Sequence, residues 1–214
     1  MSTPTRGLIF TPDLIPGVMA GTVTVTSRVM NPQPPGWITR MGWTCFTPAG
    51  KVSGRGNYED QGPAEKFFLF PFRNGEKRYV KETWAPYRDA ATYRAQWPDT
   101  IPPWHPENEF RKWRSSMFMP RWAARTWIEI VSVKPARCQE ITEEEAIASG
   151  CRPFFDHDNP VQVKSPNGNV HPFAPLKGPL DAYAALWDQL NGKRGYPWSA
   201  NCWAWRVTFR TVSP

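Results

Sequence analysis

The chain has 214 residues, 40% of them hydrophobic, so it can bury a core, and wholesale disorder is excluded. Its net charge of +7 favours an anionic partner, with nucleic acid or a nucleotide first and a membrane surface second; a basic surface without such a partner is the alternative. The 24 Pro leave little room for long helices, and the 12 Trp exceed what a core needs, which predicts indole rings in a groove or pocket.

Signals for a membrane, an oxidising compartment or a metal are weak. No apolar run approaches a membrane span, and residues 1–10 lack the apolar core of a signal peptide, so we expect a cytoplasmic protein without a membrane partner. Asp156-His157-Asp158 is too weak a pattern to predict a metal site, and no cofactor is expected. The cysteines lack C-x-x-C spacing, which predicts reduced, partly buried thiols; they are Cys45, Cys138, Cys151 and Cys202.

The first thirty residues predict a strand, a short helix and a second strand. Residues 7–10 are an apolar run, and Thr11-Pro12-Asp13 is typical of a helix start. Pro16-Gly17 interrupts the helical apolar face, so we expect a short or kinked helix that ends near Gly21. Alternating Thr and Val over residues 22–29 predicts a strand with its threonines on one face.

The middle of the chain predicts strands and a long insertion. A Gly-rich hairpin region is expected at residues 49–62. Residues 85–116 are rich in Pro, Trp and charge, which indicates a long loop with one short helix near residues 107–113. Further strands are expected at residues 37–46, 66–72 and 78–84.

The last third gives the strongest local signals. Residues 125–133 predict a strand, and Thr142-x-x-Glu145 is a capping box for a helix over 143–149 that stops at Gly150. Residues 152–178 form a second insertion, and 201–212 predict a closing strand with Trp203, Trp205, Val207 and Phe209 on one face. Residues 180–191 predict an amphipathic helix whose apolar side holds Leu180, Tyr183, Ala184, Leu186, Trp187 and Leu190. Strands outweigh helices and no regular crossover helices separate them, which predicts an α+β domain on a curled antiparallel or mixed sheet.

The run Ser115-Ser116-Met117-Phe118-Met119-Pro120-Arg121-Trp122-Ala123-Ala124-Arg125 resembles the signature of ASCH-domain proteins of bacteriophages and prophages. Other matching segments follow the same order along the chain: residues 8–12, 28–34, 80–86, 140–146, 186–192 and 198–205. The resemblance implies a PUA-like fold, a curled β-barrel flanked by short helices. It also implies one domain over residues 1–214, with insertions at 85–116 and 152–178, located in the host cytoplasm if phage-encoded.

The catalytic relatives within this resemblance are small bacterial amidohydrolases that deacylate acetylated cytidine with Lys, Thr and Glu. Aligned to them, the Lys position is Val23, the Thr position is Thr26, and the Glu position is Ser149. Valine cannot take a proton and serine cannot replace a carboxylate, so we expect binding without catalysis. The alternative is an amidohydrolase with a rebuilt site that uses Thr26 with Glu82 or Lys81.

The resemblance implies a pocket beside the threonine strand that holds RNA, DNA or a nucleotide. Threonine hydroxyls hydrogen-bond base edges, Arg binds phosphate and Trp stacks on bases. A third alternative is a phage protein that binds a host protein or a defence signalling nucleotide. The predicted binding residues are Thr24, Thr26, Arg28, Trp84, Arg121, Trp122 and Arg125.

Structural interpretations compete with these roles. Arg121 and Arg125 could bond loop carbonyls while packing on Trp122, and Glu82 could pair with Lys81 or Arg78. The run Arg111-Lys112-Trp113-Arg114 interleaves charge and an aromatic ring, as nucleic-acid contacts do, and fits a solvated helix face equally well.

Overall fold

The computed structural model describes residues 7–35, 38–43, 51–58, 62–69, 72–87, 90–96, 112–151 and 178–213. The chain divides into two compact units. Unit 1 comprises Met1–Thr24, Phe72–Val133 and Thr208–Pro214, and unit 2 comprises Val25–Pro71 and Lys134–Val207. Two long strands have residues in both units, and the single-domain interpretation stays a prediction.

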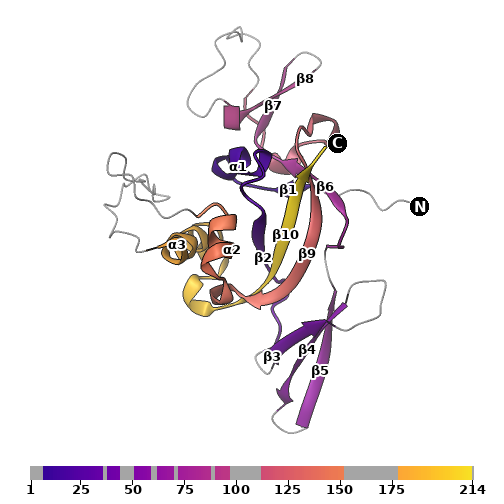
Figure 1. Ribbon diagram of the computed structural model, residues 1–214, viewed down its shortest axis with the longest axis vertical. Helices are drawn as coiled ribbons and strands as arrows, with labels where there is room; N and C mark the ends of the chain where they lie inside the picture. The colour runs from indigo at the N-terminus through magenta and orange to yellow at the C-terminus, as the bar shows by residue number, and fades with distance from the viewer. Residues whose placement is uncertain are drawn as a thin grey trace, which may run out of the picture. The chain divides into compact units, whose positions relative to one another are not determined.

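Five strands form one sheet in the order β1-β6-β9-β10-β2 (Figure 1). They are β1 (Leu8–Ile9), β6 (Lys77–Lys81), β9 (Trp127–Arg137), β10 (Trp203–Val212) and β2 (Val25–Val29). β1 pairs parallel with β6, and β6 pairs antiparallel with β9, so the sheet is mixed. The α+β class is confirmed. Because β1 and β2 stand at opposite ends of the order, the described residues form an open sheet and no closed barrel, and the PUA-like curled barrel stays a prediction.

Two smaller antiparallel sheets include strands predicted at residues 37–46 and 66–72, together with segments predicted as hairpin or loop. β3 (Ile38–Trp43), β4 (Lys51–Tyr58) and β5 (Gly62–Leu69) form a three-stranded sheet, so the Gly-rich region contains a full strand. β7 (Trp84–Tyr87) and β8 (Ala90–Tyr93) pair in a hairpin within the stretch predicted as a long loop. The helix expected near 107–113 and the insertion predicted at 152–178 lie outside the described ranges, apart from residues 112, 113 and 178.

The N-terminal helix of unit 1 begins and ends where the sequence indicates. η1 (Pro12–Leu14) continues into α1 (Ile15–Met19), and Gly21 follows at φ 71°, which is costly for residues with a side chain. Gly17 also allows a close approach, because a Cβ there would lie 2.6 Å from Cγ2 of the buried Val23. The core of unit 1 includes Phe10, Ile15, Val18, Val80, Ile128, Ile130 and Phe209.

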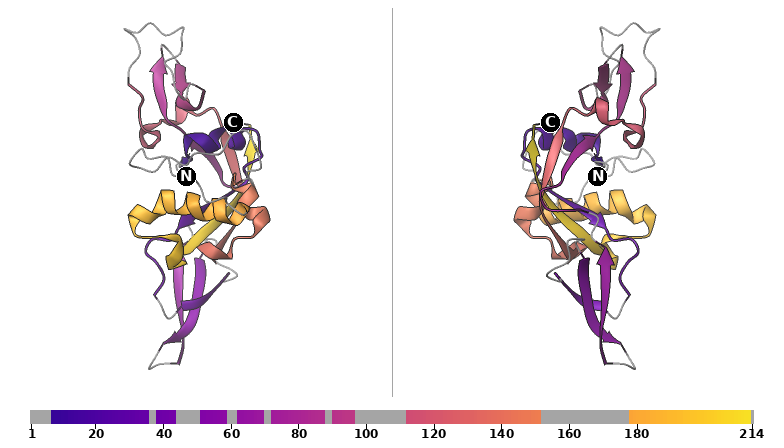
Figure 2. Two further views of the ribbon diagram at one scale, coloured as in Figure 1. Left: turned by 90° about the vertical axis from the view of Figure 1, so that its left-hand side faces the viewer. Right: turned by 90° about the vertical axis from the view of Figure 1, so that its right-hand side faces the viewer.

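In unit 2, α2 (Glu143–Ala148) packs against α3 (Pro179–Asn191), and Figure 2 shows both helices. The predicted capping box is confirmed: Thr142 Oγ1 accepts from the Glu145 N–H at 3.2 Å, and Glu145 accepts from the Thr142 N–H. Gly150 at φ 93° follows α2 as expected. The remaining short helices are η2 (Arg94–Gln96), η3 (Ser116–Phe118), η4 (Arg121–Ala123), η5 (Cys138–Glu140), η6 (Gly192–Arg194) and η7 (Trp198–Ala200).

The buried stripe of α3 follows a spacing of four residues: Pro179, Tyr183, Trp187 and Asn191. The prediction that Leu180 and Leu190 share the buried side was wrong, because both side chains are exposed. Each lies one position from the stripe and so falls on its flank. In β10, the alternate residues Ala204 and Arg206 are buried as well as the predicted face, so both faces of its first half are covered.

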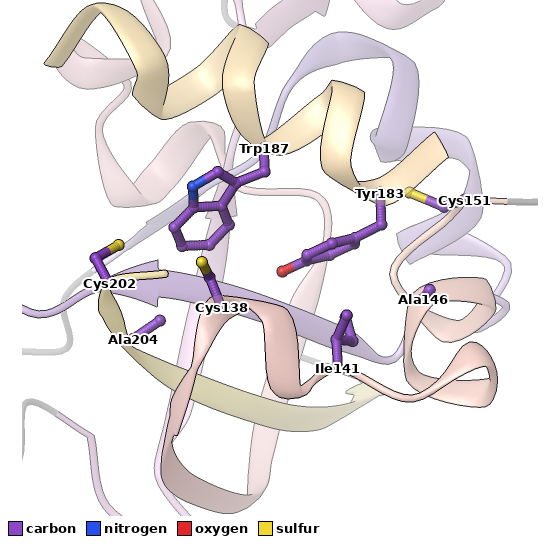
Figure 3. Close-up of a cluster of buried hydrophobic side chains, with 8 residues drawn as sticks. All are labelled: Cys138, Ile141, Ala146, Cys151, Tyr183, Trp187, Cys202 and Ala204. Carbon is purple, nitrogen blue, oxygen red and sulfur yellow. The ribbon is translucent and has the colours of Figure 1, made fainter. Parts of the chain in front are cut away.

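A cluster of buried side chains joins α3 to the start of β10 (Figure 3). Tyr183 and Trp187 point from α3 toward Cys138 and Ile141, as the figure shows. Burial, with Cys202 as a neighbour, raises the pKa of Cys138 to about 12, and burial raises the pKa of Cys151 to about 11. These thiols therefore stay protonated at neutral pH and serve as packing. Cys45 lies outside the described residues.

Arg206 is a buried cation in unit 2. Its Nη1 donates to Oε2 of Glu145 and to the Glu140 carbonyl oxygen, each at 2.9 Å, and its Nη2 donates to the Arg137 carbonyl at 3.2 Å. Burial alone would raise the pKa of Glu145. The hydrogen bond from Lys134 and the charge of Arg206 outweigh it, so the pKa lies below its ordinary value.

Replacing Glu145 by Gln should lower the free energy of unfolding near neutral pH by about 2 kcal/mol, because the buried Arg206 loses its carboxylate. A depressed carboxyl pKa contributes stability above the ordinary pKa of 4.5 and loses it as pH falls through the folded value. The variant should therefore show a smaller loss of stability on acidification. Denaturant unfolding at a series of pH values measures both effects.

The matched control is Lys134→Gln, which removes the more exposed partner of the same carboxylate. Its effect should stay below about 1 kcal/mol. Equal losses of unfolding free energy in the two variants would contradict the inference that Glu145 stabilises the fold mainly through Arg206.

Candidate functional site

Glu82 lies between β6 and β7 and is 1% exposed. Its carboxylate accepts two hydrogen bonds from Arg125, one from Nε and one from Nη2, each at 2.8 Å. The expected pairing with Lys81 or Arg78 was wrong. Arg78 pairs with Glu76 at 3.0 Å, and the Lys81 Nζ donates to the Met117 carbonyl oxygen at 2.7 Å.

Arg125 is fixed from a second side by an aromatic ring. Its guanidinium carbon lies 4.1 Å from the centroid of Tyr93, whose hydroxyl donates to the Ala123 carbonyl at 2.7 Å. Burial raises the pKa of Tyr93, and the opposing effect of Arg125 does not reverse this. Arg125 thus ties β8 to the residues before β9, and its charge is compensated by Glu82. Arg125 is therefore held within the scaffold, and its role as a phosphate ligand stays a prediction.

Trp84 is also part of the scaffold, because it is 2% exposed and cannot stack on a ligand. It packs with Met119 and Ala123. Backbone hydrogen bonds in both directions join it to Arg114, at 3.2 and 2.8 Å. The Arg114 guanidinium carbon lies 5.3 Å from the Trp84 ring centroid.

Trp122 has the opposite environment, with 62% of its surface exposed. Its ring centroid lies 5.7 Å from that of Trp84, with the planes at 88°, so the buried ring supports the exposed one. Arg121 is exposed, and its guanidinium carbon lies 5.1 Å from the centroid of Trp127, not on Trp122 as one interpretation expected. Phe118 and Met117 are 73% and 62% exposed. We call the set Arg114, Met117, Phe118, Arg121 and Trp122 the aromatic–basic surface.

Two single-turn helices present this surface. In η3, the Ser115 carbonyl accepts from the Phe118 N–H at 3.0 Å, and the Ser115 hydroxyl caps the turn by accepting from the Met117 N–H. In η4, the Arg121 carbonyl accepts from the Ala124 N–H at 3.0 Å. Met119 between them is buried, and its sulfur accepts from the Glu82 N–H at 3.2 Å. The turns are therefore anchored from below while their aromatic side chains face solvent.

The residues predicted around the threonine strand are divided between the two units. Thr24 belongs to unit 1, where its carbonyl accepts from the Phe209 N–H at 2.8 Å. Thr26 and Arg28 lie half-buried on β2 in unit 2. Burial lowers the pKa of Arg28 to about 10, partly countered by Tyr183 and reinforced by Arg194.

The side chains at the two positions aligned with the catalytic Lys and Glu are buried in the fold. Val23 is buried beside Gly17, and the buried Ser149 donates its hydroxyl proton to the Glu145 carbonyl at 2.8 Å. Neither residue type supplies a group that exchanges protons near neutral pH.

Among the described residues, no three or more His, Cys, Asp or Glu gather to bind a metal ion, and Asp156-His157-Asp158 lies outside those ranges. The described helices include none long and apolar enough to cross a membrane.

Sequence reasoning missed Phe118, Met117 and Tyr93. The sequence did hold a sign of the two exposed rings. Met119-Pro120 lies between Phe118 and Trp122 and separates two single turns, so neither ring belongs to a continuous helix. Compared with known proteins, the chain matches no family model, no curated protein and no solved structure. The geometry of the surface therefore carries the functional argument.

Replacing Glu82 or Arg125 singly by Met should lower the free energy of unfolding by about 3–5 kcal/mol, because each leaves an uncompensated, mostly buried charge. The double variant should lose less than the sum of the two. Urea unfolding in a double-mutant cycle measures this coupling.

The exposed pair Arg210–Glu129 gives a matched control, with an expected coupling below about 1 kcal/mol. Additive losses at Glu82 and Arg125 would show that their contact contributes no coupling.

The loss of unfolding free energy on Trp84→Ala should be much larger than the loss on Trp122→Ala, because only Trp84 is buried. We expect Trp84→Ala to cost about 3–5 kcal/mol through the cavity it leaves. Trp122→Ala should cost about 1 kcal/mol or less, because most of its ring is already in water. Thermal and urea unfolding of both variants would test this, and equal destabilisation would contradict the assignment of Trp122 to the surface.

Proposed function

We propose that the chain binds nucleic acid through the aromatic–basic surface, without catalysis. The observation that carries the proposal is that the side chains of Trp122, Phe118, Arg114 and Arg121 are all exposed within one segment that contains no acid. Residues 112–126 contain four basic residues and no Asp or Glu. Arg125 is compensated by Glu82, and the other three basic side chains are exposed. Cations bind phosphates and exposed rings stack on bases, so the surface offers both contacts that nucleic acid requires.

The resemblance to phage ASCH-domain proteins supports the same proposal, and with it a PUA-like fold. The run from Ser115 to Arg125 contains every residue of the aromatic–basic surface except Arg114, and it also contains Arg125, which binds Glu82. The α+β class and the mixed sheet agree with such a fold. The absence of catalysis rests on Val23 and Ser149, which stand where the enzymes carry Lys and Glu, and on Glu82, whose two carboxylate oxygens accept from Arg125.

Fluorescence anisotropy with labelled DNA and RNA oligonucleotides at about 50 mM salt tests the proposal. Arg121→Gln and Arg114→Gln should each reduce the slope of log affinity against log salt by about 1. Trp122→Ala should weaken binding about fivefold or more.

Arg210→Gln is the matched control, because it removes one exposed positive charge from unit 1 outside the aromatic–basic surface. Its salt slope and affinity should stay close to those of the parent chain. Failure to bind any of the oligonucleotides at low salt would refute the proposed function. Equal losses in Arg210→Gln and Arg121→Gln would show that net charge, and not this surface, determines binding.

A further inference from the structure

The aromatic rings of the surface are presented in a way that restricts what can stack on them. Phe118 and Trp122 belong to consecutive single-turn helices, and both are more than half exposed. Trp122 is supported on one side by the edge-to-face contact with the buried Trp84, which fixes its orientation. A planar ligand that covers these rings gains apolar burial without moving the scaffold.

The charges beside the rings are likewise held in place. Arg114 is joined to Trp84 by two backbone hydrogen bonds and lies over its ring, and Arg121 lies over Trp127. Lys81, which has its ammonium group on the Met117 carbonyl, adds a further cation at the base of η3. Guanidinium groups that are already ordered lose little conformational entropy when they bind phosphate.

We propose that the aromatic–basic surface selects unpaired nucleotides, so that its ligand is single-stranded nucleic acid. Bases stack on Phe118 and Trp122, and the connecting phosphates bind Arg114 and Arg121. This inference rests on the proposed function and narrows it to one class of ligand. In a duplex, each base face is covered by its neighbours, so the rings find no partner and only the phosphate contacts remain.

The test compares one labelled strand of about 15 nucleotides with the same strand annealed to its complement, as DNA and as RNA. Anisotropy titrations of the full chain should give an affinity for the single strand at least about tenfold higher than for the duplex. A preference of this size with either the DNA or the RNA strand supports the inference, and the strand that binds more tightly identifies the preferred sugar.

Variants of Phe118 and Trp122 test whether their rings cause the preference for single strands. Phe118→Ala and Trp122→Ala should each reduce the ratio of single-strand to duplex affinity several-fold, leaving duplex affinity nearly unchanged. Trp122→Phe keeps a ring and should retain most of the preference. Circular dichroism and thermal unfolding verify that the variants are folded, which the exposure of both side chains leads us to expect.

The outcomes separate the two proposals. Equal affinity for strand and duplex, with the salt slope still dependent on Arg121, would overturn the single-strand inference and leave nucleic-acid binding intact. A preference for single strands that survives Phe118→Ala and Trp122→Ala would also overturn it. Binding to neither form would refute the inference together with the proposed function.

Discussion

The carboxylate of Glu82 is almost fully removed from water, and a charge in that position requires a cation with good hydrogen-bond geometry. Arg125 provides it through two bonds of 2.8 Å and is itself packed on Tyr93. The pair joins the residue after β6 to the approach to β9. A buried ion pair adds little net stability, because removing both charges from water costs about as much as their attraction returns. The role of this pair is therefore to fix the position of the chain around Arg125. It holds the end of the segment whose start is fixed by the backbone bonds between Trp84 and Arg114.

The buried arginine of unit 2, Arg206, has a different set of hydrogen-bond acceptors. Arg206 donates from Nη1 and Nη2 to the Glu145 carboxylate and to the carbonyls of Glu140 and Cys138, so it joins η5 to β10 and to the capped α2. Arg125 and Arg206 are thus both paired with a carboxylate inside their own unit. On the aromatic–basic surface, by contrast, the side chains of Arg114 and Arg121 are exposed.

The rules that act over a few residues could be applied from the sequence alone. The capping box at Thr142, the left-handed Gly21 and Gly150, and the strand leading from Trp127 all follow from local steric and hydrogen-bonding requirements. The partner of Glu82 lies 43 residues away, so local reasoning assigned it to nearer cations. Trp84 and Trp122 show the same limit. They are the same residue type with opposite exposure, and the difference is set by Met119, Ala123 and Arg114 closing over Trp84.

The stretch between β8 and Arg114 begins and ends at adjacent backbone positions. The Thr83 carbonyl accepts from the Arg94 N–H at 2.9 Å, and the next residue, Trp84, exchanges hydrogen bonds with Arg114. For a chain closed at neighbouring anchors, doubling the enclosed length costs only about 0.6 kcal/mol. A change in the number of residues between these two anchors therefore adds little to the free energy of closing the chain. The backbone bonds to Thr83 and Trp84 set where Arg94 and Arg114 lie, so the start of the segment that bears the aromatic–basic surface is fixed by these anchors.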